Sequence, residues 1–129
     1  MNNMLRLLVL VAAASLIATG ISQGDLSRRG RYLTEEVAKC QECHTQRLAS
    51  GELDRSAWLR GSTKSGMVSP DITPGGRLWK RWGENGMLRF LLTGRNPDGA
   101  VAASPMPAYQ LRRDDAEAIL TYLKTLHVK

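Results

Sequence analysis

The chain has 129 residues and a formal net charge of +6, with 18 Lys and Arg against 12 Asp and Glu. Its two cysteines exclude a disulfide framework, and its 43% hydrophobic and 23% charged residues exclude collagen-like, low-complexity and strongly disordered chains. One small domain remains, with only 3 Trp, 3 Tyr and 1 Phe for its core. Small domains often rely on a metal, a disulfide or a cofactor, so the composition invites a search for a prosthetic group.

The N-terminal segment, residues 1–22, contains no acid and one base, Arg6, which precedes an apolar run from Leu7 to Ile21. This layout is typical of a secretory signal peptide. Counted from Met4, the segment reaches 18 residues, the lower limit for a membrane span, so an uncleaved N-terminal anchor remains open. In either case residues 23–129 are expected to be exported, to the periplasm or the outer face of the cytoplasmic membrane.

Two helices are predicted in the first two thirds of the exported part, from apolar residues at helical spacing. The first begins at Asp25 as its N-cap residue and runs to about Ala38 or Lys39. The second spans about 84–93, and Gly94 follows it at a position where glycine commonly ends a helix.

The last helix is expected from Asp114, as its cap, to about Leu126. Its apolar stripe fits a period of 3.6 residues and consists of Ala116, Ile119, Leu120, Leu123 and Leu126. Glycines and prolines mark 45–76 and 95–109 as loops, with a short helical turn around 54–59. Because no stretch alternates convincingly as a strand, we expect an all-α, loop-rich domain.

The strongest chemical signal is the run Cys40-Gln41-Glu42-Cys43-His44, which has the C-x-x-C-H spacing of c-type haem attachment. Two thiols at this spacing can bond to the two vinyl groups of one porphyrin, and the adjacent histidine is carried to the iron as its proximal ligand. Three alternatives are weaker. A zinc site normally needs four ligands, a thioredoxin-like pair needs a β-α-β setting, and a structural disulfide would leave the histidine unexplained.

Beyond this motif, the chain resembles the class I c-type cytochromes, in particular the single-haem domains found as subunits of bacterial dehydrogenase complexes. The resemblance covers nearly the whole exported part and rests on Gly30-Arg31-Tyr32-Leu33, Trp58-Leu59-Arg60-Gly61, Ser69-Pro70-Asp71-Ile72-Thr73-Pro74, Trp82 followed by Gly94, and Met106-Pro107-Ala108-Tyr109. Asp71 stands where the family usually has Asn. The resemblance implies a small cytochrome c-like domain, with three main helices and long loops wrapped around one covalently bound haem c.

The second axial ligand separates electron carriers from haem enzymes, because a Met/His pair leaves no open position on the iron. In the exported part the candidates are Met67, Met87, Met106 and His127. Met87 lies on the apolar side of a predicted helix, where a core role accounts for it, and His127 suits the end of the last helix. Met106 stands between two prolines that stiffen its loop, and the resemblance implies that it is the distal ligand.

The resemblance also assigns roles to residues around the haem. Gly30 is expected to let the first helix cross the last one closely, against Tyr122. The segment 70–73 is expected to supply donors near the haem propionates. Trp79 or Trp82 could cover a haem edge, and a core role is equally open for both.

We therefore expect an exported one-electron carrier, not itself an enzyme, with Cys40, Cys43, His44 and Met106 binding one haem c and His44 and Met106 its iron. It could serve as the electron-transfer subunit of a dehydrogenase or respiratory complex. The alternatives are a small haem enzyme or gas sensor with an open sixth position, and a non-haem binding module. The scattered bases suit a solvated surface or steering toward an acidic redox partner, and no nucleic acid is expected outside the cytoplasm.

Overall fold

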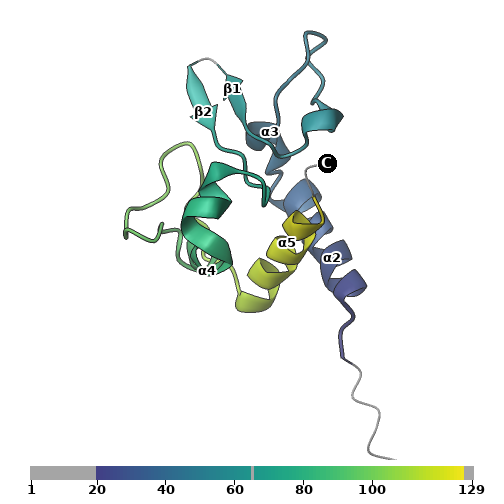
Figure 1. Ribbon diagram of the computed structural model, residues 1–129, viewed down its shortest axis with the longest axis vertical. Coiled ribbons are helices and arrows are strands. Elements are labelled where there is room, and N and C mark those ends of the chain that lie inside the picture. Colours follow the sequence, from purple (N-terminus) through teal and green to yellow (C-terminus); the bar gives the residue numbers. More distant parts are fainter. Residues whose placement is uncertain (1–19, 65, 127–129) are drawn as a thin grey trace, which may run out of the picture.

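The computed structural model describes residues 20–64 and 66–126, so most of the predicted export segment and His127 lie outside the described residues. Along the chain (Figure 1) the elements are helix α2 (Gln23–Tyr32), the π-helical turn η1 (Leu33–Val37), helix α3 (Gln41–His44), the 3-10 turn η2 (Arg55–Ala57), strands β1 (Ser62–Lys64) and β2 (Met67–Ser69), helix α4 (Arg77–Thr93) and helix α5 (Arg113–Thr125). Within the part of the chain that the structure describes, no helix is long and apolar enough to cross a membrane.

Helix α2 begins at a different cap from the predicted one. The Ser22 side chain accepts a hydrogen bond from the Asp25 backbone N–H at 3.1 Å, so Ser22 is the N-cap residue and Asp25 lies in the first turn. A carboxylate is favourable there too, because it faces the positive end of the helix dipole. The predicted length is confirmed, since η1 continues α2 to Val37. In η1 the Ala38 N–H donates to the Leu33 carbonyl at 2.8 Å, the wider spacing of a π-helix.

Helices α2 and α5 lie side by side and pack closely (Figure 1). A Cβ atom at Gly30 would lie 1.8 Å from the carbonyl oxygen of Ala118 and 2.9 Å from the Cβ atom of Tyr122, which confirms the expected close crossing. The predicted stripe of α5 is buried at Ala116, Ile119, Leu120 and Leu123. The expectation that Asp114 caps this helix is wrong, because α5 begins one residue earlier, at Arg113.

Helix α4 starts earlier than the sequence indicates. It begins at Arg77, and Gly83, with a φ of +65°, interrupts its helical backbone. The predicted helix 84–93 is the second of the two pieces, and it ends as expected at Gly94, whose φ is +67°. The first piece, 77–82, is too short to show a helical period by itself, so the sequence pattern does not reveal it.

The hairpin of β1 and β2 corrects the expectation of an all-α domain. Its strands pair antiparallel, with Thr63 opposite Val68. Each strand has three residues, which is too short for an alternation of polar and apolar residues to stand out. Gly66 lies in the connection with a φ of +81°, a conformation that favours glycine. The described part of the chain is therefore mainly helical, with one small sheet.

The hydrophobic core is small, and most of its buried members lie on α5. Its buried members are Leu59, Met87, Ile119, Leu120, Tyr122 and Leu123. Leu59 comes from the loop after η2, so the long loop contributes to the core as well as connecting helices. The three tryptophans, Trp58, Trp79 and Trp82, are partly buried and pack against this cluster.

Candidate functional site

One cavity of about 730 Å³ lies between the α3 turn, strand β2, helix α4 and the loop 95–109. This volume falls within the range of small-molecule and cofactor sites. Its wall includes all four residues that the sequence analysis assigned to cofactor binding, Cys40, Cys43, His44 and Met106. Apolar side chains form much of the remaining wall, among them Ile72, Leu78, Leu91, Leu111, Ile119 and Leu123. The fold thus brings residues that are far apart in the chain to one apolar space.

The C-x-x-C-H run forms the single helical turn α3 and the residue before it. The His44 N–H donates to the Cys40 carbonyl at 2.9 Å, which closes this turn. Before the turn, the Cys40 N–H donates to the Thr34 carbonyl at 3.0 Å, so the motif is attached directly to η1. Lys39 connects the two with a φ of +52°, an uncommon conformation for a residue with a side chain. The short connection holds the motif close against the end of the first helix.

The His44 ring is oriented by a backbone partner. Its Nδ1–H donates to the Pro70 carbonyl oxygen at 2.7 Å, and the residue is only 6% exposed. Because a carbonyl can only accept, this bond assigns the proton to Nδ1 and leaves the lone pair of Nε2 for a metal. Burial lowers the pKa of His44, while the bond to Pro70 opposes that shift. A neutral, oriented imidazole of this kind is suited to bind iron.

Pro70 is the functional residue whose role the sequence analysis missed. The segment 70–73 was expected to face haem propionates, and that expectation stays a prediction. What the structure shows instead is that the Pro70 carbonyl holds the His44 ring. The only sequence signal was the short segment around Pro70 that resembles the family, which does not indicate a backbone acceptor.

The two cysteines are free thiols, Cys40 half-buried and Cys43 exposed. Burial raises the pKa of Cys40 to about 11, so its thiol keeps its proton at neutral pH. Among residues 20–64 and 66–126, no group of three or more His, Cys, Asp or Glu side chains could hold a metal ion. Within the same ranges, Cys40 and Cys43 are not bonded to each other. Thiols beside an oriented imidazole, on the wall of an apolar cavity, fit a covalently attached haem.

All three methionine candidates lie on the cavity wall, in different settings. Met87 is 6% exposed and belongs to the hydrophobic core, as the sequence analysis expected. Met67 is 42% exposed on strand β2. Met106 is half-buried in the loop 95–109 and lines the cavity without belonging to the core cluster. Its setting therefore leaves a thioether available to the cavity, whereas Met87 is already used for core packing.

Of the two tryptophans that could cover a haem edge, Trp82 lies on the cavity wall. Its ring packs against Phe90 with the centroids 5.4 Å apart, and Phe90 lines the cavity as well. Trp79 packs against the core. The structure thus favours Trp82 as the aromatic residue that would contact a bound group.

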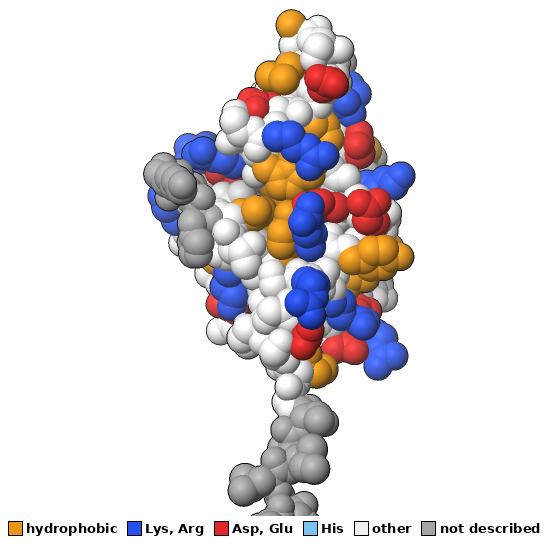
Figure 2. Space-filling view, turned by 90° about the vertical axis from the view of Figure 1, so that its right-hand side faces the viewer, with side chains coloured by type: hydrophobic (Ala, Val, Ile, Leu, Met, Phe, Trp, Pro, Cys, Tyr) orange, Lys and Arg blue, Asp and Glu red, His pale blue; other side chains and the backbone are white. Residues whose placement is uncertain are grey.

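Charged side chains are mixed over the surface. Figure 2 shows Lys and Arg interspersed with Asp and Glu on the face that it presents. Several of these residues form exposed ion pairs, such as Lys124 with Glu84 at 2.7 Å and Arg113 with Glu117 at 3.3 Å. Among the residues that line the cavity, three large hydrophobic side chains are exposed: Met67, Val68 and Val101. We call these three residues the apolar rim.

No family model matches the chain. It is 35% identical to a protein named diheme cytochrome c-type from Cereibacter sphaeroides, over 90% of the chain and 43% of that protein. It is 36% identical to the fructose dehydrogenase cytochrome subunit of Gluconobacter japonicus, over 84% of the chain and 24% of that subunit. It is 28% identical to the gluconate 2-dehydrogenase cytochrome c subunit of Pantoea cypripedii, over 78% of the chain and 26% of that subunit. The chain spans less than half the length of each of these relatives.

Proposed function

The chain is similar to c-type cytochromes, including the cytochrome subunits of dehydrogenases, and we propose that it is a one-electron carrier with one covalently attached haem c. The observation that carries the proposal is the meeting of Cys40, Cys43, His44 and Met106 on the wall of one apolar cavity. The single C-x-x-C-H motif supports one haem for this chain. The names of the relatives support an electron-transfer role rather than catalysis by the chain itself.

Each of the four residues has its own task in this proposal. Cys40 and Cys43 would hold the haem through thioether bonds. His44, oriented by Pro70, would hold the iron through Nε2. Met106, on the wall of the same cavity, would hold the iron through its sulfur and so keep water and small ligands from it. When bound, the haem supplies a one-electron iron couple, and a His/Met ligand pair raises its potential.

The apolar rim is the contact surface that we assign to the redox partner. Met67, Val68 and Val101 are exposed around the cavity, so a partner docked there would exclude water near the haem edge. Residues 23–129 carry 17 Lys and Arg against 12 Asp and Glu, and this net positive charge favours encounter with an acidic partner, since opposite charges accelerate association. By analogy with the relatives, that partner is a dehydrogenase, and the chain serves as its electron-transfer subunit. On the acceptor side, a terminal oxidase is the partner that we propose.

Export is part of the same proposal. Haem attachment through C-x-x-C-H and an apolar N-terminal run both suit a protein of the periplasm or the outer face of the cytoplasmic membrane. Residues 1–22 are then removed as a signal peptide or retained as an anchor. Cell fractionation with mass measurement of the mature chain separates these two outcomes, and a haem-free chain recovered from the cytoplasm would contradict export.

The proposal is tested by expressing the full chain in a host that matures c-type cytochromes. We expect haem that stays with the polypeptide after denaturation, reversible one-electron reduction, and slow or no binding of carbon monoxide to the ferrous protein. Rapid binding of carbon monoxide would indicate an open sixth position and favour the haem enzyme or gas sensor. A matured but colourless protein would contradict the proposal.

A further inference from the structure

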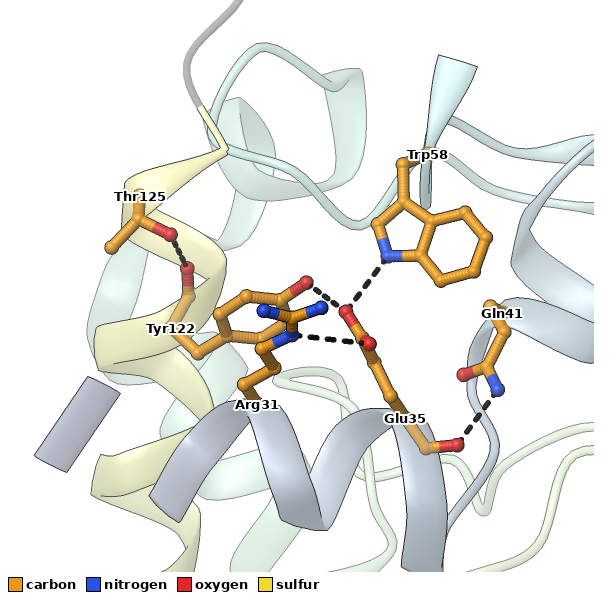
Figure 3. Close-up of polar contacts among 6 residues, drawn as sticks. All are labelled: Arg31, Glu35, Gln41, Trp58, Tyr122 and Thr125. Carbon is orange, nitrogen blue, oxygen red and sulfur yellow. Dashed lines mark hydrogen bonds and ion pairs between the residues drawn. The ribbon is translucent and has the colours of Figure 1, made fainter. Parts of the chain in front are cut away.

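A carboxylate lies behind the attachment motif, outside the wall of the cavity. Figure 3 shows the Glu35 side chain of η1 between Arg31 of α2, Trp58 of the loop after η2, and Tyr122 of α5. Its Oε1 accepts hydrogen bonds from the Trp58 indole N–H at 3.1 Å and from the Tyr122 hydroxyl, and its Oε2 accepts one from the Arg31 Nε–H at 3.3 Å. One side chain therefore joins three separate segments of the chain.

Glu35 differs from the surface ion pairs of this protein in its burial. Its side chain is 11% exposed, whereas that of Arg31 is 66% exposed. Burying a carboxylate is unfavourable unless hydrogen bonds satisfy its oxygens. Tyr122 makes the largest favourable contribution to the carboxylate, Arg31 follows through its hydrogen bond and its charge, and Trp58 adds a further neutral donor. An apolar side chain at this position would avoid the desolvation cost. The contribution of Glu35 is therefore to fix the positions of Trp58 and Tyr122 through hydrogen bonds.

The protonation states agree with this arrangement. Burial raises the pKa of Glu35, but the hydrogen bonds from Tyr122, Arg31 and Trp58, together with the positive charge of Arg31, outweigh burial, and the pKa lies below its ordinary value. Burial and the bond to Glu35 together raise the pKa of Tyr122 to about 12. At neutral pH the carboxylate is therefore an acceptor and the phenol a donor.

The backbone of the same residue is bonded to the attachment motif. The Gln41 side-chain N–H₂ donates to the Glu35 carbonyl at 2.7 Å, and Gln41 is the second residue of the C-x-x-C-H run (Figure 3). The Cys40 N–H donates to the neighbouring Thr34 carbonyl at 3.0 Å. The side-chain oxygen of Gln41 is buried without a partner among the described residues, so its bond to Glu35 is what orients this side chain. Two consecutive carbonyls of η1 thus hold the turn that carries His44.

We propose that Glu35 is a positioning residue of the haem site: its carboxylate, held by Trp58 and Tyr122, fixes η1, and η1 through Gln41 fixes the turn that presents His44. This role rests on the proposed function, because it is defined toward the haem. Glu35 does not line the cavity and acts on the site only through the residues between them. We expect this positioning to depend on the hydrogen bonds that the Glu35 side chain accepts and not on its charge alone. Substitutions that remove the charge with or without an acceptor oxygen can therefore separate the two contributions.

Glu35→Leu and Glu35→Gln separate hydrogen bonding from charge, because both remove the charge and only Gln keeps an acceptor oxygen for Trp58 and Tyr122. Glu36, the next residue of η1, is exposed, so Glu36→Leu and Glu36→Gln are the matched controls. The readouts are the hyperfine-shifted haem methyl resonances of the ferric protein, which report the orientation of the axial imidazole, and the reduction potential. We expect the largest change of both for Glu35→Leu, a smaller one for Glu35→Gln, and wild-type values for the Glu36 variants.

Equal changes in the two Glu35 variants would show that charge alone acts, and unchanged resonances in haem-loaded Glu35→Leu would show that Glu35 has no positioning role; either result overturns the inference. Tyr122→Phe keeps the charge and removes one donor, so it should also move the methyl resonances. If Glu35→Leu does not mature, the haem methyl resonances of Glu35→Gln and Tyr122→Phe test the inference instead, and unchanged resonances in both variants would overturn it. A wild-type protein without covalent haem would instead overturn the proposed function itself.

Discussion

On one side of the cavity, the turn that carries His44 is bonded to the loop that follows it in the chain. The His44 Nδ1–H donates to the Pro70 carbonyl at 2.7 Å, and the Gly61 N–H donates to the His44 carbonyl, also at 2.7 Å. The Ser62 hydroxyl donates to the Cys43 carbonyl at 2.5 Å. These hydrogen bonds join residues that are distant in sequence, and both partners of each bond belong to the protein.

On the other side, the loop 95–109 that carries Met106 is bonded mainly to itself. The Met106 N–H donates to the Ala103 carbonyl at 2.9 Å, and the Asn96 N–H donates to the Ala100 carbonyl at 2.9 Å. The Tyr109 hydroxyl donates to the Ala38 carbonyl of another segment, but this hydrogen bond is long, at 3.5 Å.

This difference in hydrogen bonding indicates which part of the site depends on bound haem. In the folded domain, hydrogen bonds from other segments of the chain orient His44, whereas the position of Met106 should depend on a bond to the haem iron. Mutations on the His44 side should therefore affect stability without changing the axial ligands. Mutations on the Met106 side should change the ligands and the potential directly.

The largest effect is expected from removing both thiols, with Cys40→Ala and Cys43→Ala combined. Covalent haem should be lost completely, and the domain should be largely unfolded, because the small core needs the apolar area that a porphyrin supplies. Haem staining of denatured protein and circular dichroism measure the two effects. A colourless double variant that still unfolds cooperatively would contradict the dependence of the fold on haem.

Met106→Ala should keep the haem attached but abolish the weak far-red sulfur-to-iron absorption of the ferric protein. The reduction potential should fall, because methionine ligation favours the ferrous state, and carbon monoxide should then bind rapidly. The free energy of unfolding should also fall, because the loop 95–109 would lose its bond to the iron. Met67→Ala is the matched control and should leave the absorption unchanged. If the Met67 variant loses the band and the Met106 variant keeps it, the ligand assignment is wrong.

Thr45→Val sharpens the comparison on the His44 side. The buried Thr45 hydroxyl oxygen accepts a hydrogen bond from the Leu59 N–H at 2.9 Å, so valine would leave that N–H unpaired. The free energy of unfolding in urea should fall by about 1–3 kcal/mol, while the far-red band remains. Thr63→Val, at an exposed position of β1, should have little effect on stability. Loss of the band in the Thr45 variant would show that the two sides are not independent.

The smallest effect concerns pH. Because the pKa of Glu35 is below its ordinary value of 4.5 in the folded protein, its ionisation stabilises the fold above that pH. This contribution should be lost as the pH falls from 4.5 through the lower, folded-state pKa. Urea unfolding at pH 7, 4 and 3 measures it, and Glu35→Gln should lose less stability over this range than the wild type does. Glu36→Gln should keep the wild-type dependence, and the same slope in all three proteins would contradict the role of Glu35.

Several features of the fold could be predicted from local patterns. The apolar stripe of α5 and the end of α4 at Gly94 are confirmed, and each depends on residues within one element. The close crossing at Gly30 is confirmed as well, but it follows from the family resemblance and not from a local pattern. Other local patterns predict wrongly: Ser22 rather than Asp25 caps α2, and a hairpin forms around Gly66 where the sequence indicates a loop. Short elements and competing cap residues carry too little pattern to decide between alternatives.

The sequence by itself determined the candidate chemistry, because Cys40 to His44 are consecutive and their spacing alone matches two vinyl groups and one iron. Only the tertiary structure decided what holds that chemistry in place. The bond from His44 to Pro70 joins residues 26 positions apart, and Glu35 joins Trp58 and Tyr122, 23 and 87 positions away. A helical period or a short motif relates residues within a few turns of chain. Hydrogen bonds of this range depend on how whole helices and loops pack together, which no local pattern records.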